Sequence, residues 1–203
     1  MLTYTDHDHK YYWNGVKTLG VNEILQASGV SNFDHIPAHL REGAMHFGKV
    51  VHATCELWDR VNLDIEQLMK DDKDSEYKVL PYLEGWIKFK KESGCKIISI
   101  ENKFYSKRGF AGRHDRVVLM PDLTMLDIKM SVDAKGGTDL QLAAYSILWD
   151  ENQPPSDKIK NRIAVRLTPE NYQIIPFKNK SDRNDFLICL NQAKLLQKRG
   201  ILK

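Results

Sequence analysis

The chain has 203 residues, of which 42% are hydrophobic and 28% charged, so it is long enough for one domain with a core and has the composition of a globular protein. Its formal net charge of +3 permits a nucleic-acid partner without requiring one. No apolar run reaches the roughly 18 residues of a membrane helix, and no signal-peptide pattern opens the chain. Three cysteines without a CxxC pair exclude a disulfide scaffold and a four-cysteine iron–sulfur site. We therefore expect a cytoplasmic protein with no membrane contact.

The first half of the chain predicts a β-hairpin followed by helices. Residues 10–20 alternate in polarity around Asn14-Gly15, a dipeptide typical of two-residue hairpin turns. Apolar residues then recur at helical spacing in three segments, each begun or ended by a proline or glycine, over residues 21–28, 37–60 and 79–93. The polar stretch 61–78 is expected to be a loop with at most one helical turn.

Strand patterns dominate the second half. Strands are expected over residues 96–105, 110–120, 124–130, 163–167 and 172–177, and helices over 139–150 and 182–199. Gly136-Gly137 break the chain before the first of these helices. Helices before, between and after strands predict an α/β fold, with a central mixed β-sheet flanked by helices and an N-terminal β-hairpin. We expect one domain over residues 1–203, with the hairpin and first helix in 1–30 and the core in 37–203.

Two carboxylates and a lysine are predicted to meet on one face of this sheet. Asp127 and Lys129 are alternate residues of one strand and therefore point to the same face, and a hairpin brings Asp115 beside them. Carboxylates hold hard divalent cations, and a lysine stabilises charge that develops on a phosphate, so the constellation indicates metal-assisted phosphodiester hydrolysis. The alternatives are a solvated Asp115 at a strand end, an Asp127–Lys129 ion pair and an exposed Lys129.

Two further groups have both a chemical and a structural interpretation. His52 lies four residues before Glu56 and four after Gly48 on one helix face, where its imidazole would complete a cation shell and Gly48 would allow close helix packing. The helix pattern alone favours a half-buried His52 bonded to a backbone carbonyl, and Glu56 as a surface acid. Glu101 would either face the carboxylate cluster or pair with Lys103 on its own strand.

The next predicted helix carries Gln141 and Tyr145, four residues apart on one face. Both would point toward a phosphate, although the local pattern alone favours a Gln141 that closes a capping box with Thr138 and a Tyr145 that packs in the core. Basic residues also crowd around Asp115 and would offset its charge toward a polyanion. These residues are Lys103, Lys107, Arg108, Arg113 and Arg116.

The order of these motifs resembles the PD-(D/E)XK nuclease superfamily, above all its RecB-like branch, which includes small phage-type exonucleases. The resemblance covers most of the chain and implies a restriction-endonuclease-like nuclease core. It is carried by Gly48-x-x-x-His52, Glu101, Gly112-x-x-Asp115, Asp127-Ile128-Lys129 and Gln141-x-x-x-Tyr145. The branch often has arginine where this chain has Phe47 and an apolar residue where it has His114, which would lie near the metal or face the other side of the strand.

The resemblance also implies roles for the matched residues. The cofactor Mg²⁺ or Mn²⁺ would be bound by His52, Asp115, Asp127 and the backbone carbonyl of Ile128. The implied catalytic residues are Glu101, Asp115, Asp127, Lys129, Gln141 and Tyr145. Gln141 and Tyr145 would in addition position DNA, whose backbone the five basic residues would bind.

These implications converge on a divalent-metal-dependent deoxyribonuclease, with an exonuclease favoured over an endonuclease, in phage-type DNA recombination, repair or processing. Its expected partners in a bacterial or phage-infected cell are single- or double-stranded DNA and a single-strand annealing or recombination protein. The alternatives are a structure-selective endonuclease, an enzyme acting on RNA, a catalytically inert nucleic-acid-binding module with a nuclease fold, and a recombination accessory. The presence of Asp115, Asp127 and Lys129 argues against an inert module.

Overall fold

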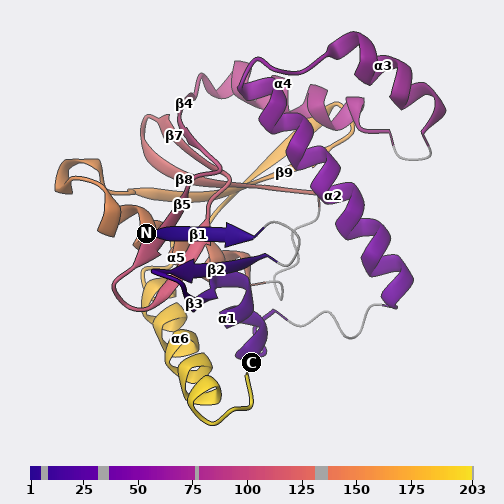
Figure 1. Cartoon of the computed structure of the whole chain (residues 1–203). Helices are drawn as coiled ribbons and strands as arrows, with labels where there is room; N and C mark the ends of the chain where they lie inside the picture. The colour runs from indigo at the N-terminus through magenta and orange to yellow at the C-terminus, as the bar shows by residue number, and fades with distance from the viewer. Residues whose placement is uncertain (6–8, 32–36, 76–77, 131–136, 203) are drawn as a thin grey trace.

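Two five-stranded mixed sheets with helices around them make up the computed structural model, which describes residues 1–5, 9–31, 37–75, 78–130 and 137–202 (Figure 1). The predicted α/β class and the N-terminal hairpin are confirmed. The strands are divided between two sheets, where the sequence predicts one central sheet. Within the described ranges, no helix is both long and apolar enough to cross a bilayer.

The first sheet contains the N-terminal hairpin. Its strands, in spatial order, are β1 (Leu2–Thr5), β2 (Lys10–Trp13), β3 (Val16–Gly20), β6 (Phe110–Arg113) and β5 (Lys103–Ser106). All neighbours are antiparallel except β3 and β6. Asn14 and Gly15 have positive φ angles of 50° and 80°, as a type I′ hairpin turn requires. Strand β1 was not predicted from the sequence.

The second sheet has a buried central strand. Its strands, in spatial order, are β10 (Asn171–Pro176), β9 (Asn161–Thr168), β8 (Asp122–Lys129), β7 (Arg116–Met120) and β4 (Lys96–Ile100). Only β8 and β9 are parallel neighbours. Residues 124–128 of β8 are all buried, which is expected of a strand covered by helices on both faces.

The helices lie close to the positions that the sequence predicts, with one correction. They are α1 (Val21–Ala27), α2 (Ala38–Asp59), α3 (Ile65–Asp74), α4 (Leu80–Ser93), α5 (Thr138–Asn152), the short 3₁₀ helix η1 (Pro155–Asp157) and α6 (Asp182–Lys198). The prediction of a loop over 61–78 is wrong, because α3 forms there. The Asp64 carboxylate accepts from the Gln67 N–H at 2.9 Å and caps this helix, while Ile65 and Leu68 pack against the core.

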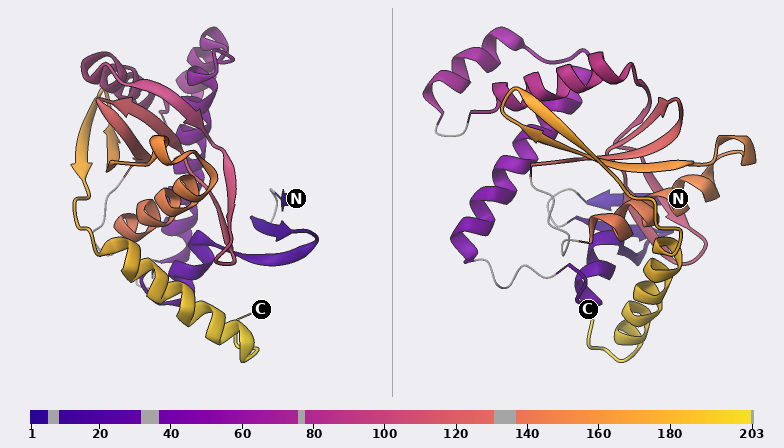
Figure 2. Two further views of the ribbon diagram at one scale, coloured as in Figure 1. Left: turned by 90° about the vertical axis from the view of Figure 1, so that its left-hand side faces the viewer. Right: turned by 180° about the vertical axis from the view of Figure 1, so that it is seen from behind.

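Two hydrophobic cores lie on opposite faces of the second sheet. Helix α5 covers one face, where α1 and α6 share a core with it and with Met125 of β8, whereas α2 and α4 share the other core with Leu126 and Ile128. Figure 2 shows α4 on one side of this sheet and α5 with α6 on the other. Because side chains alternate along a strand, Asp127 and Lys129 share the face of Met125, toward α5.

The two sheets meet where the chain crosses from one to the other. Strand β4 passes to β5 through Glu101, whose φ is 53°, and β6 passes to β7 through His114 and Asp115. The crossings lie side by side, because the Glu101 N–H donates to the Asp115 carbonyl at 3.0 Å and the His114 N–H donates to the Asn102 carbonyl at 3.4 Å. The two longest predicted strands are therefore interrupted, and Glu101 and Asp115 lie at the junction of the sheets.

Candidate functional site

A cleft of about 860 Å³ opens beside the junction, between helix α2, the N-terminal hairpin and the ends of strands β6 and β8. It brings together side chains from α2, α5, β8 and both crossings. The predicted catalytic and metal-binding side chains that line it are His52, Glu101, Asp115, Asp127, Lys129, Gln141 and Tyr145. Residues far apart in the chain thus line a single cleft.

Asp115 is fixed by contacts at its carboxylate. Strand β7 begins at Arg116, opposite Leu126 of β8. Beyond this pair, none of the described strands lies beside β8 on that side. Asp115 takes this position: its Oδ2 accepts from the Ile128 N–H at 2.9 Å and lies 3.2 Å from His52 Nδ1. Burial alone would raise the pKa of Asp115, but the facing His52 charge and these hydrogen bonds hold it well below its usual range.

His52 reaches the cleft from α2, with 28% of its side chain exposed. Burial alone would lower the pKa of His52, but the Asp115 carboxylate raises it above its usual value. Its partner is thus a carboxylate, so the backbone-carbonyl partner favoured by the helix pattern is wrong. Glu56 also lines the cleft and pairs with Arg60 at 2.8 Å. Gly48 makes no close helix contact within the described ranges, since a Cβ there would meet none of their atoms within 4 Å.

Asp127 and Lys129 form the ion pair that the sequence analysis left as an alternative. Asp127 Oδ2 lies 2.6 Å from Lys129 Nζ and has no other polar partner in the described part of the chain. Burial and the Asp115 charge raise the pKa of Asp127 to about 6, although Lys129 opposes this. Burial would lower the pKa of Lys129, but Asp127 and Asp115 raise it, so the ammonium stays charged in the cleft.

The Gln141 amide links α5 to Lys129. Its Oε1 accepts from Lys129 Nζ at 3.1 Å, and its Nε2 donates to Tyr145 OH at 3.2 Å and to Asn22 Oδ1 at 2.9 Å. The predicted capping box is wrong, because α5 has Gly137 as its N-cap, with φ 70°, and Thr138 is already helical. The other glycine of the predicted break, Gly136, lies outside the described residues.

Asn22 is a cleft residue that the sequence analysis missed. It lies on the short helix α1 and reaches the site only because α1 packs beside α5. No local pattern around Asn22 marks it, so only the tertiary fold reveals its contact with Gln141.

Glu101 faces the cluster and pairs with two arginines. Its Oε2 lies 2.9 Å from Arg113 Nε and its Oε1 lies 3.4 Å from Arg116 NH1. Lys103, which the sequence leaves as an alternative partner of Glu101, places its Nζ 4.9 Å from the centre of the Tyr4 ring. Burial and the Asp115 charge raise the pKa of Glu101 to about 7, against the two arginines.

Three donor atoms, one each from His52, Glu101 and Asp115, lie within 4.8 Å of one another. Asp127 is outside this group but is a further buried carboxylate in the same cleft. Burial is the main cause of the raised pKa values of Glu101 and Asp127, and repulsion from the Asp115 charge adds to it. Carboxylates with one imidazole fit Mg²⁺ or Mn²⁺, and the cation would relieve this repulsion.

The Ile128 backbone faces the same group. Its N–H points at Asp115, and a strand residue directs its C=O to the same side as its N–H. The carbonyl ligand that the resemblance implies therefore lies on the appropriate edge of β8.

The five predicted DNA-binding cations separate in the structure. Arg113 lines the cleft, whereas Lys107 and Arg108 do not, and Arg108 pairs with Glu151 at 2.9 Å. The prediction for Arg116 is wrong: only 1% of its side chain is exposed, so it cannot contact a polyanion at the surface. Two lysines that were not predicted from the sequence, Lys10 of β2 and Lys49 of α2, line the cleft instead. They are far apart in the sequence, and only the fold brings them together.

His114 lies on the side of the crossing away from the cleft. Its Nε2 is 2.9 Å from Ser99 Oγ, and its ring stacks on Phe104 and meets the edge of Trp149. His114 therefore faces the other side of the chain from the proposed metal ligands, which is the second of the two positions expected for it.

No family model and no curated protein matches the chain. Among solved structures, a crystal structure from Eubacterium rectale, provisionally named an exonuclease, is 15% identical, covers 77% of this chain and 69% of its own, and has a TM-score of 0.48. A second, of the protein SSO0001, is 17% identical, covers 70% of this chain and 71% of its own, and has a TM-score of 0.37. An assignment of activity therefore depends on the residues of the cleft.

Proposed function

We propose that the chain is a divalent-metal-dependent nuclease that hydrolyses phosphodiester bonds of DNA, with exonuclease action favoured over endonuclease action. One observation carries the proposal. A single cleft contains three donor atoms that are close enough together to bind one cation, and beside them lies Lys129, on the strand that also bears the buried Asp127 carboxylate. Metal-assisted phosphodiester hydrolysis needs this combination, because the ligands place positive charge on the phosphate and the lysine adds to it.

Among the described residues, His52, Asp115 and Glu101 are grouped closely enough to share a cation, and we include Asp127 and the Ile128 carbonyl as further ligands. When bound, Mg²⁺ or Mn²⁺ supplies Lewis acidity toward a phosphate oxygen. Asp115 contributes an ionised carboxylate whose direction is fixed by the β8 backbone.

Lys129, Gln141 and Tyr145 orient the substrate in this proposal. The Lys129 ammonium is held between Asp127 and Gln141, so it presents a fixed charge where negative charge develops on the phosphate. Burial raises the pKa of Tyr145 well above its usual value. Its hydroxyl therefore keeps its proton and can donate a hydrogen bond to a phosphate oxygen.

Lys10, Lys49 and Arg113 give the cleft the positive charge that a polyanion needs beside several carboxylates. Contacts of this kind bind the backbone and carry no sequence information. We therefore expect cleavage without sequence preference.

The test is incubation of purified protein with end-labelled linear single- and double-stranded DNA and with closed circular DNA, in Mg²⁺, Mn²⁺ or EDTA. We expect cation-dependent loss of the linear substrates while circles remain. Lys129→Met should slow cleavage by about 10²–10³-fold, the usual cost of losing one group that stabilises transition-state charge.

The matched control is Lys96→Met, which removes an exposed lysine of β4 far from Lys129 in the sheet and should leave the rate unchanged. Circular dichroism checks that both variants are folded. Cleavage of circles would move the proposal to an endonuclease, and DNA binding without any cleavage would favour the inert binding module.

A further inference from the structure

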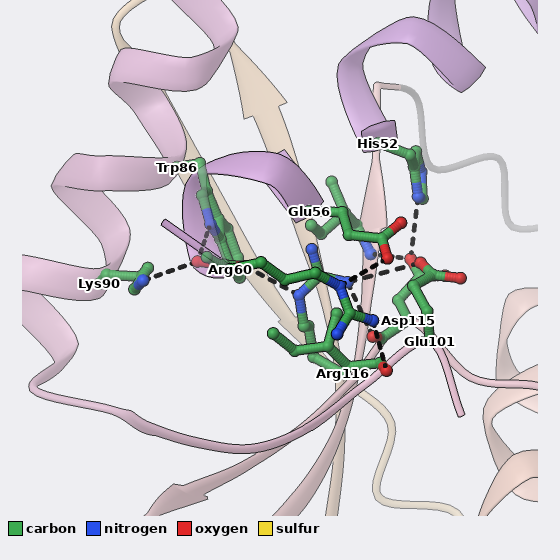
Figure 3. Close-up of polar contacts among 11 residues, drawn as sticks. His52, Glu56, Arg60, Trp86, Lys90, Glu101, Asp115 and Arg116 are labelled. Carbon is green, nitrogen blue, oxygen red and sulfur yellow. Dashed lines mark hydrogen bonds and ion pairs between the residues drawn. The ribbon is translucent and has the colours of Figure 1, made fainter. Parts of the chain in front are cut away.

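Arg116 is a buried cation that the proposed chemistry does not use. Only 1% of its side chain is exposed, and its guanidinium lies between the carboxylate cluster and the core under α4 (Figure 3). Its Cζ is 5.9 Å from the centre of the Trp86 ring. Since Arg116 cannot reach a substrate, its effect must pass through the residues that it contacts.

On the side away from the cleft, Arg116 is anchored by Asp59, the last residue of α2. Asp59 Oδ2 lies 2.8 Å from Arg116 Nε, and the Asp59 side chain is fully buried. The other oxygen, Oδ1, accepts from Trp86 Nε1 at 3.1 Å and from Lys90 Nζ at 2.6 Å. Two helices, α2 and α4, thus hold the anchor in one position.

On the cleft side, Arg116 NH1 contacts two members of the candidate cation group. It donates to the Asp115 carbonyl at 2.8 Å and lies 3.4 Å from Glu101 Oε1. The same Asp115 carbonyl accepts from the Glu101 N–H at 3.0 Å. One guanidinium nitrogen therefore joins the two chain crossings that carry Glu101 and Asp115.

A contribution to stability does not explain the contacts of Arg116, because they carry energetic costs. Burying an ion pair costs desolvation energy that the attraction often fails to recover, and Arg116 NH2 has no hydrogen-bond partner among the described residues. Glu101 also adopts a positive φ of 53°, which is unfavourable for a residue with a side chain. These costs fit a role in fixing geometry, because two carboxylates that repel each other need a neighbouring cation to stay close.

We propose that Arg116, anchored by Asp59, is a positioning residue that sets Glu101 and Asp115 at the spacing needed to bind a divalent cation. This proposal rests on the proposed function, since it concerns the same cation group. Outer contacts that orient metal ligands typically change metal affinity by about 10–100-fold when removed. Lysine at position 116 would keep the charge but lose the fork that reaches Asp59 and the cleft together.

The test is calorimetric titration of Mn²⁺ alone into metal-free wild-type protein and three variants. Arg116→Lys and Asp59→Asn should each weaken Mn²⁺ binding by about 10-fold or more. Arg162→Lys is the matched control, because Arg162 forms a similar buried pair with Asp182 at 2.8 Å outside the cleft; it should bind Mn²⁺ as wild type does. If Arg116→Lys fails to fold, Asp59→Asn still tests the proposal, because asparagine keeps the size and shape of the Asp59 side chain.

Thermal unfolding of each variant separates positioning from stability. Weaker Mn²⁺ binding by folded Arg116→Lys or Asp59→Asn, with Arg162→Lys unaffected, supports the proposal. Lower unfolding temperatures with unchanged Mn²⁺ affinity would overturn it, as would equal weakening in Arg162→Lys. Failure of the wild-type protein to bind Mn²⁺ would overturn the proposed function as well, so the two failures are distinguishable.

Discussion

Adjacent residues at the crossing between β6 and β7 have opposite environments. Asp115 lines the cleft, whereas His114 is 2% exposed and contacts Ser99 and Phe104 on the other side. Burial lowers the pKa of His114 to about 4. The imidazole of the folded protein is therefore neutral above about pH 4, and it packs behind the crossing that carries Asp115.

The first prediction concerns His114 and pH. The pKa of His114 is about 4 in the folded protein and 6.5 for an ordinary histidine. Between pH 4 and pH 6.5 the unfolded chain therefore binds more protons than the folded protein, and stability falls as pH decreases. The loss amounts to at most about 3 kcal/mol. His114→Gln cannot titrate, so its unfolding free energy, measured with urea in EDTA, should fall less over this range. Parallel pH curves for the two proteins would show that His114 is not held neutral by burial.

At the scale of elements, α2 and α4 differ in how their glycines are used. A Cβ on Gly85 of α4 would lie 2.4 Å from the Asn171 carbonyl oxygen and 3.0 Å from that of Thr168, at the β9–β10 turn. A Cβ on Gly48 of α2 would meet no atom of the described residues within 4 Å. Helix α4 therefore packs directly on the sheet through Gly85, whereas Gly48 faces the open cleft.

The second prediction compares alanine at these two positions. Gly85→Ala should destabilise the protein by about 1–3 kcal/mol, because backbone atoms must move to admit the methyl group. Gly48→Ala should stabilise it by up to about 1 kcal/mol, the difference in helix propensity between the residues. Denaturant unfolding of both variants measures the difference, and an equal effect of the two substitutions would mean that α4 does not pack this closely.

The elements predicted best are those with strong local signals. The hairpin at Asn14-Gly15 and the end of α4 at Gly94 were predictable because both glycines adopt positive φ. Helix α3 and the role of Gln141 were not, since both depend on distant partners: Leu68 packs on the core beneath α4, and Gln141 bonds to Lys129 in place of its own helix terminus.

At the scale of the whole molecule, the site depends on the junction of two sheets. The sequence predicts the α/β class and the residues that meet, because motif order and alternation carry that information. It does not predict that the chain changes sheet at Glu101 and Asp115. The buried role of Arg116 follows from this change, since the crossing turns its side chain toward Asp59 and away from solvent.

The third prediction tests the two cores through the cysteines. Cys55 and Cys189 are buried, whereas Cys95 is partly exposed, and burial raises the pKa of the Cys55 thiol to about 12. Only Cys95 should therefore react quickly with a disulfide reagent near pH 8, since the thiolate is the reactive form. Cys95→Ser should remove the fast phase, and all three thiols should react in guanidinium. Fast reaction of Cys55 in the native protein would show that α2 does not cover the sheet as described.

The most direct measurement is anomalous diffraction from a crystal of the wild-type protein soaked in Mn²⁺. We predict a manganese peak in the cleft, within bonding distance of His52 and Asp115. Manganese peaks found only outside the cleft, in crystals whose cleft is open to solvent, would contradict the cation site on which the proposed nuclease activity depends.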